Sequence, residues 1–534
     1  MIPHSKDNIA DTRFLTWFFI ILVILSLVVY RDIFTVKPSG DDFTPPLAEI
    51  HRGQVDGPLA FFKSSQLGNY RPLDSLLMWA FGSISQKHVL FWIHILHILS
   101  FWFFTLVVFM WINLLKLNKV GAVVTALIVF FHPVIAGPVA SIDGSSRILV
   151  SAFVWLGVFF IMKYSNRSFF AASLACVLAF IIALGFMEYA IQLVPLAFIA
   201  VIFCAQKSKL LKTIALIVVL GIVLMAYLLL RGLIVGQGIS FFRFVTPNPA
   251  DWIKNAALIY SAVLFLGNTV WVKVAGNISA YAWFLFNIIL VVIALSIGAF
   301  IYQKEILKIS NRIETENMKS GYLHDKLKLP FLFLSFLFSC FPMIFVRDLS
   351  ELYLSGVIVP LALISGFAAD GWSRMPRRYP AIAVLLLIFE IAIAIQAIES
   401  KVDDLKIAGG RTHALAKEIL KYIPEDASGW KIGFVFLKSE IDMSDSYSIF
   451  RMPDIYLIYP TLGMFAMDWY RPGKNHNLIY LVVSDISQLE NSDYNAVFQW
   501  ETQTEPKKED FDLILRWNYQ TKKSELIQLL HDCD

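Results

Sequence analysis

Apolar runs long enough to cross a bilayer recur along most of this chain and limit its possible folds more than any other feature. A helix that crosses the hydrocarbon core needs about 20 mostly apolar residues. Eleven such runs lie near 14–34, 88–115, 120–137, 147–163, 168–186, 188–205, 211–235, 278–302, 329–346, 352–369 and 380–398. Because 57% of the residues are hydrophobic and only 16% charged, unlike a soluble domain, they predict an all-α polytopic membrane protein.

Basic residues between the runs predict the orientation. They are Lys116 and Lys119, Lys163 and Arg167, Lys207, Lys209 and Lys212, and Arg374, Arg377 and Arg378. The positive-inside rule makes these connections cytoplasmic, and they alternate with the runs if the N-terminus is inside. Counting 254–270 as a span would break this alternation, so we interpret it as re-entrant or interfacial. We expect a multi-pass protein of a bacterial inner membrane, whose first run is a retained signal anchor.

The predicted organisation has two parts. Residues 1–398 form a transmembrane module of about eleven helices, with a long outer loop at 31–87. Residues 399–534 are more polar and contain the strand-like stretches 432–436 and 478–483, which predict a small α/β soluble domain on the outer side. The net charge of +4 is spread over short loops, so we expect no nucleic-acid partner. Four cysteines without a CxxC pair argue against a disulfide framework or a cysteine zinc site.

Polar residues are concentrated in the segments predicted to face outward. They are Asp41, Asp42, Tyr70, Arg71, His132, Asp143, Arg147, Glu188, Arg231, Glu351 and Tyr353. Charged groups close to lipid are costly to keep and are usually functional. Carboxylates beside arginines predict a site that pairs a base with an anionic group, and a phosphate suits the planar fork of arginine.

Several of these residues also have a purely structural interpretation. Gly40-Asp41-Asp42 is turn chemistry, and Tyr70-Arg71-Pro72-Leu73 could cap the helix that follows. His132 precedes a proline at a predicted helix end, which favours a structural role. His94 and His97, on an apolar run, favour buried hydrogen bonding over metal binding. Glu188, between two apolar runs, is the hardest to explain structurally.

Three short motifs follow in a fixed order, Gly40-Asp41-Asp42-Phe43, Gly68-Asn69-Tyr70-Arg71-Pro72-Leu73 and Phe131-His132-Pro133-Val134. This series resembles the GT-C superfamily of membrane glycosyltransferases, closest to the branch of the tetratricopeptide-linked O-mannosyltransferases and their bacterial relatives. The turn Asp143–Arg147 is similar to the one that follows the His-Pro element there.

Two later elements carry the resemblance with changes. Leu184-Gly185-Phe186-Met187-Glu188 is similar to the family's Leu-x-x-Lys-Glu element, with Met187 where lysine is common. Ser350-Glu351-Leu352-Tyr353-Leu354 is similar to Glu-Arg-Tyr-Leu-Tyr, with Leu352 in place of arginine. Gly137 stands where the family often has a second acidic residue, and 399–534 stands where the closest relatives carry their repeats.

The resemblance implies a glycosyltransferase that uses a polyprenyl-phosphate-linked sugar at the outer membrane face. Asp41 or Asp42 would be the catalytic base. Arg71 would position the loop or the phosphate, and Glu188 and Glu351 would face the same cavity. The acceptor would be a hydroxyl on a protein or a glycan. No cofactor is required, although the acidic clusters would permit a divalent cation.

Two other functions fit the same polar residues. A transporter or flippase for a lipid-linked or anionic substrate would bind with the same arginines, but transporters often consist of two matched halves, which this sequence does not show. A non-catalytic scaffold would not need its charges gathered on one face. We therefore expect an enzyme and keep the transporter as the alternative.

Overall fold

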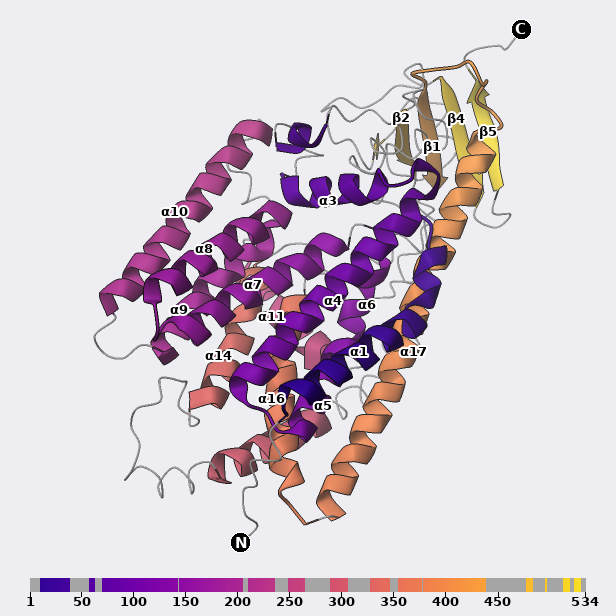
Figure 1. The fold of residues 1–534 in the computed structure, drawn as a ribbon. Helices are drawn as coiled ribbons and strands as arrows, with labels where there is room; N and C mark the ends of the chain where they lie inside the picture. Colours follow the sequence, from indigo (N-terminus) through magenta and orange to yellow (C-terminus); the bar gives the residue numbers. More distant parts are fainter. Residues whose placement is uncertain are drawn as a thin grey trace.

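The computed structural model describes residues 10–38, 57–62, 70–142, 144–204, 210–235, 248–264, 289–305, 327–345, 354–376, 378–437, 477–483, 495–496, 512–518 and 523–529. Most of them form helices packed into one bundle, with a small β-sheet beyond one end (Figure 1). We call the end nearest the sheet the sheet end and the opposite end, where α1 begins, the N-terminal end (Figure 1). Asp41, Asp42, Asp143, Glu351 and Tyr353 lie outside the described residues.

The bundle is built from apolar helices of very different lengths. They are α1 (Thr12–Val29), α4 (Val89–Leu115), α5 (Lys119–Phe131), α6 (Pro133–Ala140), α7 (Ser145–Tyr164), α8 (Phe169–Phe186), α9 (Leu193–Cys204), α10 (Leu210–Val235), α11 (Pro249–Leu264), α14 (Lys328–Ser339), α15 (Phe341–Ile344), α16 (Ser355–Ser373) and α17 (Arg378–Ile419). Within the described ranges, seven helices are long and apolar enough to span a membrane, or eight if α5 and α6, bent by 48°, form one span. The chain is an integral multi-pass membrane protein, and eleven spans stays a prediction.

Shorter elements gather at the sheet end. They are η2 (Arg31–Thr35), η4 (Pro58–Phe62), α3 (Pro72–Gly82), η5 (Gln86–His88) and η6 (Glu188–Gln192). Helix α3 begins with Pro72, a residue well suited to a first helical turn, and lies across the upper end of the bundle (Figure 1). The region that we predicted as re-entrant or interfacial, 254–270, overlaps α11, of which the structure describes 16 residues, and its relation to the membrane stays a prediction.

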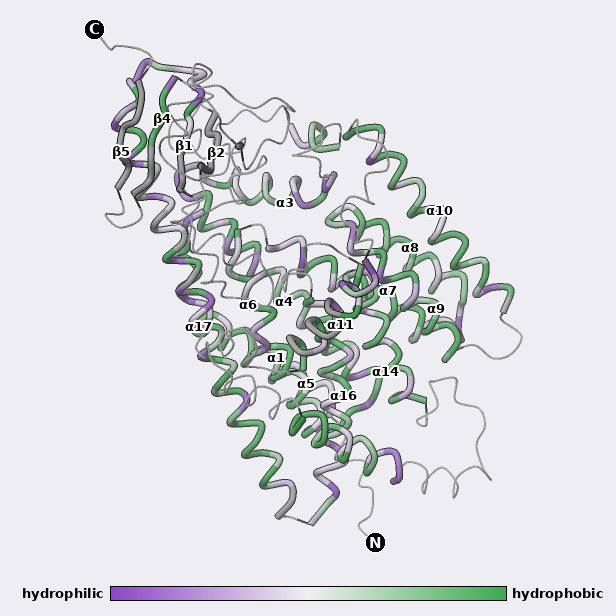
Figure 2. Tube along the Cα trace, turned by 180° about the vertical axis from the view of Figure 1, so that it is seen from behind, coloured by the Kyte–Doolittle hydropathy of each residue, from purple (hydrophilic) through white to green (hydrophobic). Residues whose placement is uncertain are grey.

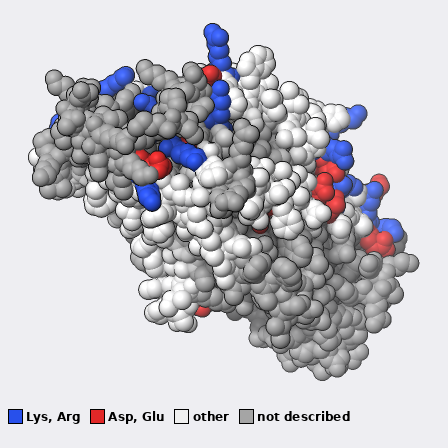
Figure 3. Space-filling model, turned by 90° about the horizontal axis from the view of Figure 1, so that it is seen from below, with Lys and Arg blue, Asp and Glu red and all other residues white. Residues whose placement is uncertain are grey.

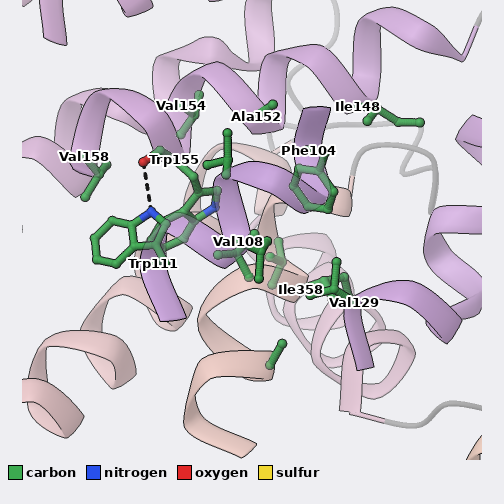
Figure 4. Packing of buried hydrophobic residues seen from close by; sticks show 14 of the residues in the cluster. Phe104, Val108, Trp111, Val129, Ile148, Ala152, Val154, Trp155, Val158 and Ile358 are labelled. Carbon is green, nitrogen blue, oxygen red and sulfur yellow. Dashed lines mark hydrogen bonds between the residues drawn. The ribbon is translucent and has the colours of Figure 1, made fainter. Parts of the chain in front are cut away.

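The core of the bundle lies between α4, α7 and α16. Trp111 and Trp155 are fully buried and meet edge to face, with ring centroids 5.6 Å apart. Each indole also has a hydrogen-bond acceptor. Trp111 Nε1 donates to the carbonyl oxygen of Trp155 at 3.1 Å (Figure 4), and Trp155 Nε1 donates to that of Gly356 at 2.7 Å. Satisfied indoles fix the mutual position of these three helices.

Polar contacts close the N-terminal end. Lys328 Nζ donates to the carbonyl oxygen of Leu115 at 2.8 Å, and Asn118 Nδ2 donates to Asp370 at 2.7 Å. Arg374 forms an ion pair with the same Asp370 at 3.0 Å. Figure 3 looks from below and shows a described surface that is mostly uncharged, with Lys and Arg side chains in separate groups. The contact of Asn118 with Asp370 brings the ends of α4 and α16 together, and the cytoplasmic location of this end stays a prediction.

Helix α17 is much longer than a bilayer requires. Its 42 residues extend about 63 Å at 1.5 Å per residue, against a hydrocarbon core of about 30 Å. Its lower half is apolar, and its upper half carries polar residues (Figure 2). The domain boundary predicted at 398/399 falls inside this helix, which runs without a break from the bundle to the sheet.

The sheet has five strands in the order β3-β2-β1-β4-β5. The strands are β1 (Lys431–Leu437), β2 (Asn477–Val483), β3 (Asn495–Ala496), β4 (Leu513–Asn518) and β5 (Lys523–Leu529). Strand β1 pairs in parallel with β2 and β4, and the outer pairs are antiparallel. The strands predicted at 432–436 and 478–483 are confirmed as β1 and β2, while a separate soluble domain on the outer side stays a prediction.

Candidate functional site

Glu188 lies between two arginines at the sheet end of the bundle. Arg71 Nη2 donates to Glu188 Oε2 at 3.3 Å, and Arg231 Nη1 lies 3.7 Å from Glu188 Oε1. The side chains of Arg231 and Glu188 are only 8% and 12% exposed, and that of Arg71 is 22% exposed. Three segments far apart in sequence thus form one cluster, which we call the Arg–Glu–Arg cluster.

Local backbone geometry explains how each member reaches the cluster. Helix α8 ends at Phe186, and Met187 turns the chain with an extended conformation before η6 begins at Glu188. Arg71 is the N-cap of α3 and is held outside the helix, with φ −133° and ψ 65°, by the following Pro72. Arg231 belongs to the last turns of α10.

The cluster carries two positive charges against one negative charge. Glu188 lies in η6, outside the helices α8 and α9. Burial is the largest influence on its pKa and raises it, but the charges of Arg71 and Arg231, with the hydrogen bond from Arg71, hold the pKa below the ordinary value of a glutamate. Glu188 is therefore ionised at neutral pH and orients both guanidinium groups, which leave a net positive site beside the apolar bundle.

Two tyrosines that contact each other lie beside the cluster. Tyr227 Oη donates to the carbonyl oxygen of Tyr70 at 2.9 Å, and the two rings lie 6.1 Å apart. Tyr70 Oη in turn donates to the carbonyl oxygen of Phe62 at 3.4 Å. The sequence reasoning included Tyr70 but missed Tyr227, although its position four residues before Arg231 places both on one face of α10.

A small hollow lies between α7 and η6. It is lined by Arg147, Val150, Ser151, Met187, Tyr189 and Gln192. Arg147 is 8% exposed and Gln192 is 1% exposed. Ser151 Oγ lies 2.7 Å from Ser355 Oγ. Arg147 and Gln192 thus line the same hollow, and the sequence reasoning named Arg147 but not Gln192. The part of Arg147 in substrate binding stays a prediction.

His132 is held by contacts within the protein. Its Nδ1 accepts a hydrogen bond from the backbone N–H of Val134 at 3.2 Å, and its Nε2 lies 2.8 Å from the carbonyl oxygen of Val263. It is the N-cap of α6 and fully buried. These contacts match the structural interpretation that the sequence left open. Its proposed part in substrate binding stays a prediction.

The described residues hold no group of three or more His, Cys, Asp or Glu side chains that could bind a metal ion. The Arg–Glu–Arg cluster itself repels a cation, because its single carboxylate is already paired with two guanidinium groups. A divalent cation at the acidic pair Asp41 and Asp42 stays a prediction.

No protein-family model matches the sequence, and no curated protein matches it at a significant level. Among solved structures, the chain is similar to ArnT from Cupriavidus metallidurans bound to undecaprenyl phosphate, at 12% identity and a TM-score of 0.48 over 91% of this chain and 97% of that one.

The same enzyme in its apo state is similar at 11% identity and a TM-score of 0.46, over 91% of this chain and 97% of that one. An Archaeoglobus fulgidus oligosaccharyltransferase in complex with Zn and sulfate is similar at 11% identity and a TM-score of 0.42, over 88% of this chain and 68% of that one. At these TM-scores the likeness carries no argument about what the chain does.

Proposed function

We propose that this protein transfers a sugar from a polyprenyl-phosphate donor to an acceptor hydroxyl at the outer face of the membrane. The observation that carries the proposal is the Arg–Glu–Arg cluster. It is a net positive, preoriented pair of guanidinium groups at one end of a bundle of apolar helices. A lipid-linked phosphate needs this combination, because its headgroup is anionic while its tail must remain in lipid.

The surroundings of Arg231 suit the lipid part of such a donor. Neighbouring side chains of α10 are apolar and open to the outside, with Leu229 55% exposed and Leu233 82% exposed. An isoprenoid chain can lie along this helix while its phosphate reaches Arg231 and Arg71. Planar guanidinium groups bind phosphate oxygens in pairs, so these two arginines are the proposed phosphate ligands.

The proposed reaction is a direct displacement at the anomeric carbon. The acceptor oxygen forms a new bond to that carbon, the bond from the carbon to the phosphate oxygen breaks, and the phosphate leaves with the electron pair. The acceptor proton passes to Asp41 or Asp42 as general base. Arg71 and Arg231 stabilise the negative charge that develops on the leaving phosphate.

Transfer assays with the purified protein in lipid nanodiscs test the proposal. Radiolabelled polyprenyl-phosphate sugars are supplied with protein and glycan acceptors, and Asp41→Asn and Asp42→Asn are compared with wild type. A general base contributes about 10²–10⁴-fold to the rate, so one of the two variants should lose at least about a hundredfold. Glu425→Gln removes an exposed carboxylate, is the matched control and should retain activity.

The alternative function makes the opposite prediction. If no label reaches any acceptor while the labelled donor crosses the membrane of proteoliposomes, the protein is a transporter. Loss of activity in the Glu425→Gln control as well would show that the assay reports folding and not chemistry.

A further inference from the structure

The polar half of α17 contacts one segment that precedes a sequence motif and one that belongs to a motif. One is the start of the first outer loop, residues 32–37, which leads to Asp41 and Asp42. The other is the beginning of α6, next to His132. Both contacts come from a helix that the motifs do not include, so they point to a role for α17 beyond spanning the membrane.

The contact with the first loop is a close approach of two backbones. Gly409 packs against the carbonyl group of Lys37, and a Cβ at this position would lie 2.8 Å from the carbonyl carbon and 3.0 Å from the Cβ of Lys37, with the carbonyl oxygen closer still. These distances leave no room for any side chain at position 409. The next residue, Gly410, has open space where its Cβ would be.

Side chains of α17 add two polar contacts. Lys401 Nζ donates to the carbonyl oxygen of Pro133 at 3.1 Å, and Lys406 Nζ lies 3.9 Å from Asp32 Oδ2. The second pair is half-exposed and contributes little by itself. The backbone contact at Gly409 therefore makes the strongest demand on the position of the loop.

We propose that the polar half of α17 sets the position from which the first outer loop leaves the membrane, and that Gly409 is a positioning residue for glycosyl transfer. The inference rests on the proposed function. A Cβ at position 409 displaces Lys37, which precedes the acidic pair by four residues in the sequence. A misplacement of about 1 Å can cost about a hundredfold in rate.

Paired substitutions at neighbouring glycines test the proposal. Gly409→Ala and Gly409→Val are compared with Gly410→Ala and Gly410→Val in the transfer assay. We expect kcat to fall at least about tenfold in Gly409→Ala and further in Gly409→Val, while KM for the donor and binding of polyprenyl phosphate stay unchanged. Both Gly410 variants should match wild type. A merely structural role would lower donor binding and the amount of folded protein together with kcat.

A second readout does not need activity. In a cysteine-free background carrying Lys37→Cys, the maleimide labelling rate at this exposed position should change with Gly409→Val and not with Gly410→Val. Equal responses at 409 and 410 in both readouts would overturn the inference. If wild type transfers no sugar while labelling still distinguishes the two glycines, the proposed function fails and the positioning of the loop by α17 stands.

Discussion

Removal of the negative charge from the Arg–Glu–Arg cluster should destabilise the protein and make its stability depend on added anions. In Glu188→Gln the shape is kept, but the guanidinium groups of Arg71 and Arg231 lose their shared counter-charge. At 3.3 and 3.7 Å and an effective dielectric constant of about 20, each ion pair corresponds to about 5 kcal/mol of attraction. Desolvation offsets much of this, and breaking a buried pair typically costs about 3–5 kcal/mol.

The assay is thermal unfolding in detergent, followed by tryptophan fluorescence. Glu399→Gln is the matched control, because it removes an exposed carboxylate and should leave the midpoint near that of wild type. Polyprenyl phosphate should stabilise Glu188→Gln more than it stabilises wild type, because the anion supplies the missing charge. At about 100 times Kd such binding adds about 2.7 kcal/mol.

The pH dependence has a definite sign. The pKa of Glu188 is held below its ordinary value in the folded protein, so its contribution to stability is present above the pKa of an unfolded glutamate and lost as pH falls through the folded value. Glu188→Gln should remove this acid-side dependence. Equal midpoints for wild type and Glu188→Gln at neutral pH, with no extra effect of phosphate, would refute the electrostatic account of the cluster.

Two further substitutions test the packing that holds the site. His132→Ala removes the N-cap of α6 and should lower the free energy of unfolding by about 1 kcal/mol, while transfer per folded molecule is retained. A selective loss of transfer would instead assign His132 to substrate binding. Gly366→Ala places a Cβ 2.7 Å from the carbonyl oxygen of Gly121 and should destabilise the α5–α16 contact, whereas Gly232→Ala, with open space around it, should be neutral or stabilising by up to about 1 kcal/mol.

Helical segments such as α8 could be predicted because a long apolar composition is by itself enough to indicate a transmembrane helix. A run such as 168–186 must be helical in lipid, since only a helix satisfies all its backbone groups internally, and α8 covers nearly the same residues. The strands β1 and β2 were predictable for a similar reason, because each is a short apolar run bounded by polar residues.

Contacts between distant residues could not be predicted in this way. Arg71, Glu188 and Arg231 were all expected at the outer side, but eight other candidates were expected there too, and no local pattern pairs residues 117 positions apart. The continuation of α17 past residue 398 was missed because polarity was taken as a domain boundary. Glycine disfavours helix, yet Gly409 lies within α17 and permits the contact with Lys37.

The proposed reaction accounts for both the length of α17 and the position of the Arg–Glu–Arg cluster. A donor held by its phosphate at the end of the bundle needs a base above the lipid, and that base must come from a loop whose own residues are tied to something rigid. Packing against lipid or apolar helices cannot hold such a loop above the membrane, because the surroundings there are water. A helix that rises from the bundle and contacts both the first loop and α6 does supply it, and its length is then a requirement of the proposed chemistry.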